Sequence, residues 1–351
     1  MAQGHENADM PSVANSETEL HSNRYPVLDG WRGISILLVL ATHMMPVGPK
    51  AWQFNETTGP MGMAIFFTLS GFLITTFLLK SPSVVDFLIR RFFRIVPLAW
   101  VCMVIVLLAS DAATRAYFAH FLFYANLPPS IQLTEIGSHL WSLCVEVQFY
   151  VGVALLFWAL GVRGLLILPG LCLAVTAFRI AMGEEISIVT WWRIDEILAG
   201  ATLALVIARR FGEKPLLALQ RLNPYVLLLL LAVASHPVTG FANYLRPYFA
   251  AVLVGITLCR TDARLDGLLR TRALAYVAAI SYALYVIHPL LGHSWLGEGD
   301  KIVKYLKRPL LFALLFLLAH ASTFYFEQRC IDFGKRLSAR FAGKRGVQAA
   351  G

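Results

Sequence analysis

The chain has 351 residues, of which 58% are hydrophobic and only 15% are charged. A soluble domain is about 45–50% apolar and about 25% charged, so this composition excludes an ordinary soluble protein and indicates a polytopic membrane protein. The formal net charge of +9 could suggest nucleic-acid binding, but the positions of the basic residues argue against that function.

Apolar runs long enough to cross a bilayer follow one another along the chain. About 20 helical residues cross a hydrocarbon core of roughly 30 Å. Ten runs of that order lie near residues 33–47, 61–79, 95–110, 143–160, 164–182, 194–208, 224–239, 247–259, 273–291 and 309–327. The run at 115–127 precedes Pro128 and Pro129, so we expect it to be re-entrant or interfacial. The sequence therefore predicts an all-α transmembrane helical bundle with about ten spans.

Basic residues are distributed unevenly between the two sides of such a bundle. Of the 30 Lys and Arg residues, 21 lie in the N-terminal segment, the even-numbered loops and the C-terminal tail, and 8 lie in the odd-numbered loops. Because Lys and Arg accumulate in cytoplasmic loops, we expect both termini in the cytoplasm and the protein in the cell (inner) membrane. The net charge then reflects topology and attraction to anionic membrane lipids, and we expect no nucleic-acid partner.

Three segments differ in composition. Residues 1–23 are polar and lack a signal-peptide pattern, so we expect a disordered cytoplasmic segment. Residues 24–333 carry all the apolar runs and are expected to form one transmembrane domain, followed by a basic cytoplasmic tail at 334–351. The five cysteines form no CxxC pair, which predicts neither a disulfide framework nor a metal site.

Ionisable residues interrupt the first apolar run. Arg32 and His43 are 11 residues apart, which returns them to nearly the same helix face at a separation of about 16 Å. Asp29 adjoins Arg32 on the neighbouring face. Ionisable groups within a membrane are costly and tend to be functional. The alternatives are that Arg32 extends to the interface, Asp29 caps the helix and His43 makes a hydrogen bond inside the bundle.

An arginine cluster opens the third run, in the stretch DFLIRRFFRIVP at 86–97. Arg91 and Arg94 share one helical face and Arg90 adjoins them. Two planar guanidinium groups on one face suit a phosphate ligand. Ordinary cytoplasmic anchoring of a membrane helix explains any single arginine here equally well.

The fourth run opens with HLWSLCVEVQFYVG at 139–152. Glu146 and Tyr150 are one helical turn apart, and Gln148 lies between them. A carboxylate close to an apolar span needs a partner or a proton, although an interfacial glutamate capping a helix is the alternative.

The ninth run contains ISYALYVIHPLL at 280–291. It places His288 near its outer end, at a depth expected to be close to that of His43 and Glu146. His288 could equally satisfy a helix end broken by Pro289. The cluster WWRIDE at 191–196 predicts an interfacial belt with a helix start.

Five stretches together resemble the acyltransferase 3 family of integral membrane O-acyltransferases. They are LDGWRG with the later His43, FFTLSGFLIT at 66–75, RRFFRIVP, SLCVEVQFY and SYALYVIHP. Their order and spacing match the family pattern over residues 24–333. The resemblance implies transfer of an acyl group, often acetyl, from cytoplasmic acyl-CoA to a hydroxyl of a sugar-containing acceptor. That acceptor is a surface polysaccharide, a glycolipid or a glycosylated small molecule.

The resemblance also implies roles for individual residues. His43 is the expected catalytic base, Glu146 orients it or stabilises its imidazolium, and Arg91 with Arg94 and Arg90 binds the phosphates of CoA. The supporting residues are expected to be Asp29, Arg32, Ser70, Gln148, Tyr150, Ser281, Tyr285 and His288. The chain departs from the family pattern at Cys144, Val147 and Ala283, which affects substrate choice more than activity. Many relatives carry an additional extracytoplasmic esterase-like domain, and we expect a stand-alone form without it.

Two other classes of protein compete with the enzyme. A secondary transporter or flippase could use the buried His and Glu for proton coupling, and a structural or sensing protein would tolerate replacement of both. The sequence leaves open the acceptor and the side on which it is modified, the acyl chain length and the oligomeric state. It also leaves open whether the acyl group passes through His43 covalently.

Overall fold

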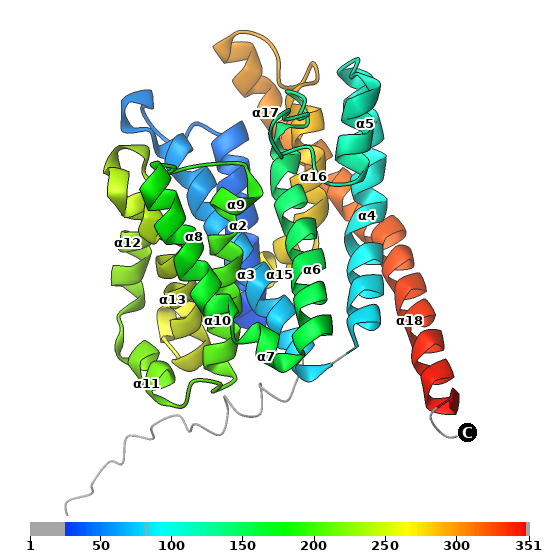
Figure 1. Ribbon diagram of the computed structural model, residues 1–351. Coiled ribbons are helices and arrows are strands. Elements are labelled where there is room, and N and C mark those ends of the chain that lie inside the picture. The colour runs from blue at the N-terminus through cyan, green and yellow to red at the C-terminus, as the bar shows by residue number, and fades with distance from the viewer. Residues whose placement is uncertain (1–24, 82, 349–351) are drawn as a thin grey trace, which may run out of the picture.

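The structure is a computed structural model that describes residues 25–81 and 83–348, with side chains to Phe341, and the described part of the chain contains helices and no strand (Figure 1). The first half forms α2 (Pro26–Met44), η1 (Lys50–Trp52), α3 (Phe54–Lys80), α4 (Val84–Ala109), α5 (Thr114–Phe121), η2 (Ser138–Leu140), α6 (Trp141–Leu160), α7 (Val162–Leu165) and α8 (Leu168–Met182). The second half forms α9 (Thr190–Arg193), α10 (Asp195–Ile207), α11 (Lys214–Arg221), α12 (Pro224–Ser235), η3 (Pro237–Leu245), α13 (Arg246–Cys259), α14 (Ala263–Leu269), α15 (Arg272–Ala279), α16 (Ser281–Gly292), α17 (Lys301–Ala321), η4 (Ser322–Glu327) and α18 (Gln328–Gln348).

Seven helices in the described ranges are long and apolar enough to cross a membrane. The number rises to nine if α11 with α12, bent by 88°, and α15 with α16, bent by 67°, each count as one span. The protein is thus a multi-pass membrane protein, but ten spans of full length are not found. The sixth predicted run, at 194–208, forms α10, whose 13 residues are too few to cross a bilayer alone.

Helix α10 lies inside the bundle and not at its surface. Its side chains from Asp195 to Ala201 are buried, and α10 packs most extensively against α3. The two helices cross closely because each has a glycine at the point of contact. A Cβ on Gly71 would lie 1.9 Å from the carbonyl oxygen of Ile197, and one on Gly200 would lie 2.0 Å from that of Thr68. Glycine permits this approach because it lacks a Cβ, as small residues do in other membrane helix pairs.

Charged residues around the start of α10 form a buried network. Arg179 donates to Asp195, the Nε of Arg246 lies 2.8 Å from Glu196, and the Nε of Arg193 lies 3.4 Å from the other oxygen of Glu196. All five side chains are at most 2% exposed. The prediction of an interfacial belt is therefore wrong for the charged part of this cluster, although a helix does start there. Paired charges can be buried where single ones cannot, so the network joins α8, α9, α10 and α13.

The two ends of the described chain lie at one end of the bundle, where α2 begins and α18 finishes (Figure 1). The predicted re-entrant or interfacial run at 115–127 forms only the eight-residue α5 and the loop after it, at the opposite end beside the top of α4 (Figure 1). The five cysteines are free thiols. The candidate site residues lie at different positions along the axis between these two ends of the bundle.

Candidate active site

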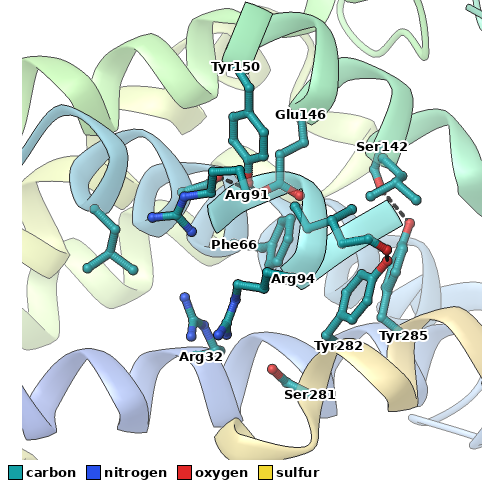
Figure 2. Close-up of a pocket in the computed structure, with 14 residues that line it drawn as sticks. Arg32, Phe66, Arg91, Arg94, Ser142, Glu146, Tyr150, Ser281, Tyr282 and Tyr285 are labelled. Atoms are coloured by element: carbon teal, nitrogen blue, oxygen red, sulfur yellow. Dashed lines mark hydrogen bonds between the residues drawn. The ribbon is translucent and has the colours of Figure 1, made fainter. Parts of the chain in front are cut away.

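A pocket of about 50 Å³ opens where α2, α3, α4, α6 and α16 meet (Figure 2). These five helices come from three separate parts of the sequence, at 26–109, 141–160 and 281–292, so the pocket exists only in the folded bundle. Eight of its lining residues had been singled out from the sequence. They are Arg32, Ser70, Arg91, Arg94, Glu146, Tyr150, Ser281 and Tyr285.

The acidic side of the pocket centres on Glu146, which is 6% exposed. Its carboxylate accepts hydrogen bonds from the hydroxyl of Ser70, at 2.5 Å, and from the hydroxyl of Tyr150 one turn further along α6. Two hydroxyl donors replace part of the hydration that burial removes. The predicted proximity of Glu146 and Tyr150 is thus confirmed, and Ser70 joins them from α3.

The basic side of the pocket consists of three guanidinium groups. Arg91 lies over the ring of Tyr150, 5.9 Å from its centroid, and over that of Phe87 at 6.0 Å. Figure 2 shows the guanidinium groups of Arg32 and Arg94 side by side between α2 and α4. Glu146 is the one carboxylate among the lining residues. Positive charge exceeds negative charge in the pocket, which suits an anionic ligand.

Five of the predicted residues do not line this pocket: Arg90, Gln148, Asp29, His43 and His288. Arg90 pairs with Asp86 at 2.5 Å on an exposed face of α4 and does not join Arg91 and Arg94 in the pocket. Gln148 donates to the carbonyl oxygen of Phe123 at 2.6 Å and thereby holds the loop after α5. Asp29 lies outside the lining but close enough to act on the charge of Arg32.

His43 lies outside the pocket as well, near the end of α2 with an exposed side chain. Within the described ranges no hydrogen bond joins it to Glu146, whose partners are Ser70 and Tyr150. The structure thus gives Glu146 other partners than the predicted His43. The physical reason is depth, because His43 ends its helix whereas Glu146 lies more than one turn inside α6. The neighbour of His43 is instead His288, with ring centroids 5.3 Å apart.

Sequence reasoning missed two residues beside the pocket. His139 precedes α6 and lies 5.5 Å from the rings of both Tyr285 and His288. Ser142 lines the pocket, and its hydroxyl is 2.5 Å from that of Tyr285. His139 opens the stretch that carries Glu146, but it precedes the apolar run, so helical periodicity did not mark it. Tyr285 lines the pocket, and its ring also neighbours those of His139 and His288.

We found no group of three His, Cys, Asp or Glu side chains arranged to hold a metal ion in the part of the chain that the structure describes. The site holds a buried carboxylate and the hydroxyls that donate to it, and imidazoles lie nearby. Carboxylates and imidazoles are side chains that can transfer protons.

Comparison with known proteins agrees with this chemistry. A family model described as an acyltransferase domain matches residues 25–327. The peptidoglycan O-acetyltransferase OatA of Listeria monocytogenes is 32% identical over 158 residues, which is 38% of this chain and 24% of that protein. The putative peptidoglycan O-acetyltransferase YrhL of Bacillus subtilis is 27% identical over 315 residues, which is 76% of this chain and 48% of that protein. The matches thus cover from about a quarter to half of the length of these curated relatives. No solved structure matches the chain.

Proposed function

The chain belongs to the acyltransferase 3 family, whose domain model covers residues 25–327, and from this premise we propose that it is a membrane-bound O-acyltransferase. The reaction moves an acyl group, acetyl in our proposal, from acyl-CoA to a hydroxyl of a sugar-containing acceptor. Two matched relatives are named for O-acetylation of peptidoglycan, which supports a carbohydrate acceptor. The observation that carries the proposal is the pocket in which three guanidinium groups face one buried carboxylate.

The donor site in this proposal is the arginine side of the pocket. CoA carries several phosphate groups, and Arg32, Arg91 and Arg94 supply planar, permanently charged donors for them. Glu146 offsets part of their charge and holds the hydroxyls of Ser70 and Tyr150 in place.

The acceptor site in this proposal lies at His43. The neutral imidazole takes the proton of the acceptor hydroxyl while the oxygen attacks the thioester carbonyl carbon. The new C–O bond forms, the C–S bond breaks, and the CoA thiolate finally takes the proton from the imidazolium. His43 lies about 16 Å along α2 from Arg32, so the flexible pantetheine arm of CoA spans the distance from the phosphates to the reacting atoms. We propose that the arginine end faces the cytoplasm, with both termini there and the protein in the cell membrane.

The test uses membranes and purified protein with labelled acetyl-CoA and a carbohydrate acceptor. Wild type should form a labelled sugar ester, and His43→Ala should lose transfer by about a hundredfold or more. His320→Ala is the matched control, because His320 is partly buried, contacts Tyr276, and neither of these residues lines the pocket. Near wild-type turnover in His43→Ala would refute the proposal that His43 is the catalytic base. Movement of a substrate across the membrane without acetyl-CoA consumption would instead favour a transporter.

A further inference from the structure

Three imidazoles gather beside the pocket from three separate elements. His43 comes from α2, His139 from η2 and His288 from α16. The ring centroids of His43 and His288 are 5.3 Å apart, and those of His139 and His288 are 5.5 Å apart. Only His43 is exposed; His139 and His288 are 6% and 1% exposed. His288 therefore contacts both the exposed ring of His43 and the buried ring of His139.

The hydrogen bonds of His288 fix which nitrogen carries its proton. Its Nδ1 lies 2.7 Å from the carbonyl oxygen of Tyr285 and 3.2 Å from that of Leu284. A carbonyl oxygen only accepts, so Nδ1 is the donor and carries the hydrogen. In the neutral ring Nε2 is then a bare acceptor. It is buried and has no hydrogen-bond partner among the described side chains and backbone.

His139 adds a second buried imidazole to the same place. Neither of its ring nitrogens makes a hydrogen bond of normal geometry within the described residues, although the backbone groups of Val286 and Ile136 lie near them. Its ring meets those of His288 and Tyr285 edge to face. Two buried imidazoles thus stand beside His43, which is the exposed ring of the three.

We propose that His288 and His139 are positioning residues for His43. The inference rests on the proposed function and assigns to His288 the part that the sequence predicted for Glu146. When His43 takes the proton of the acceptor hydroxyl, its ring becomes a cation. The Nε2 lone pair of His288 accepts a hydrogen bond from the protonated ring, and His139 supports His288 from behind. The proton stays on His43 until the CoA thiolate takes it, so no further reactant is needed.

The chain supplies a matched control for these two residues. His120, in α5, is fully buried, its Nδ1 lies 2.8 Å from the carbonyl oxygen of Ala116 one turn earlier, and its Nε2 has no partner within the described ranges. His120 thus repeats the bonding of His288 without an imidazole neighbour. A purely structural role for His288 would make the two positions equivalent.

The experiment compares two substitutions of His288 that separate its two nitrogens. His288→Asn keeps a donor near the Nδ1 position and loses the Nε2 acceptor, whereas His288→Gln can place an amide oxygen near the Nε2 position. With acetyl-CoA and acceptor, His288→Asn should lower kcat by about tenfold or more with the KM for acetyl-CoA unchanged. His288→Gln should recover part of that loss, and His139→Gln should lower kcat in the same way. His120→Asn should leave both constants unchanged.

The pH dependence of kcat gives a readout that a structural role would not move. The titratable groups near His43 are His139, His288, His293 and Tyr285. Removing the acceptor of His288 should shift the acidic limb of the profile, and His120→Asn should not. If the melting temperature shows that His288→Asn does not fold, the kcat and pH profile of His139→Gln test the positioning role instead. Wild-type kcat and an unshifted limb in the folded variants would overturn the positioning role and leave the proposed function standing. A wild-type protein without acetyl transfer would overturn both.

Discussion

Replacement of Gly200 by alanine tests whether the close crossing of α3 and α10 sets the geometry of the pocket. A Cβ at Gly200 would lie 2.0 Å from the carbonyl oxygen of Thr68 and 2.7 Å from its Cα, whereas ordinary contact begins at 3.4 Å. The two helices must therefore separate locally by about 1.4 Å, since the obstructing atoms belong to the backbone. Ser70, which donates to Glu146, lies two residues from the clash.

The magnitude follows from two opposing effects. Overpacking costs about 1–3 kcal/mol, and a backbone clash this close lies at the upper end of that range. Alanine also favours a helix over glycine by about 1 kcal/mol. We therefore expect Gly200→Ala to lose about 2 kcal/mol of stability. Gly152→Ala in α6 is the matched control, because nothing lies within 4 Å of its Cβ position, and it should gain about 1 kcal/mol.

The assay is thermal unfolding of both purified variants in one detergent, together with their acyl-transfer rates. The difference between the variants, about 3 kcal/mol, isolates the clash from the change in helix propensity. Gly200→Ala should melt below wild type and lose activity, since Ser70 moves relative to Glu146. A Gly200→Ala variant that melts as high as Gly152→Ala and keeps full activity would refute the reasoning.

The buried ion pairs and the arginine side of the pocket lead to further measurable outcomes. Arg179→Met leaves the Asp195 carboxylate unpaired inside the bundle and should cost about 3–5 kcal/mol of stability; an unchanged melting temperature would contradict this. Tyr150→Phe removes one of two hydroxyl donors to the buried carboxylate of the pocket, so acyl transfer should fall about ten- to a hundredfold, which labelled-product formation measures. Arg91→Ala should weaken CoA binding in calorimetry, whereas Arg90→Ala, outside the pocket, should not. Equal affinities in the two variants would mean that both arginines only anchor the helix at the cytoplasmic side.

Much of the fold could be predicted because the membrane restricts it. Backbone groups in lipid must bond within a helix, so the apolar runs predicted the helices that form α2, α3, α4, α6 and α8. Length was the least predictable feature. The run at 194–208 forms a helix of 13 residues, because side chains buried against α3 do not need to span lipid.

Within one helix, the sequence also determined which candidate residues share a face. The spacing of Arg91 and Arg94, and that of Glu146 and Tyr150, placed each pair together in the pocket, because helical periodicity fixes the angle between neighbouring turns. Helical periodicity could not distinguish Arg90 from the two arginines of the pocket. The guanidinium of Arg90 instead pairs with Asp86 on the exposed face of the same helix.

Only the tertiary structure decided which helices meet and at what depth. It paired Glu146 with Ser70 of α3, gave His43 the neighbour His288 of α16 and brought His139 beside that ring. Periodicity describes one helix at a time, whereas the rotation and vertical offset of two helices depend on close packing between them, as at the glycine crossing of α3 and α10. For that reason the sequence alone determined the kinds of groups in the site, and packing determined their partners.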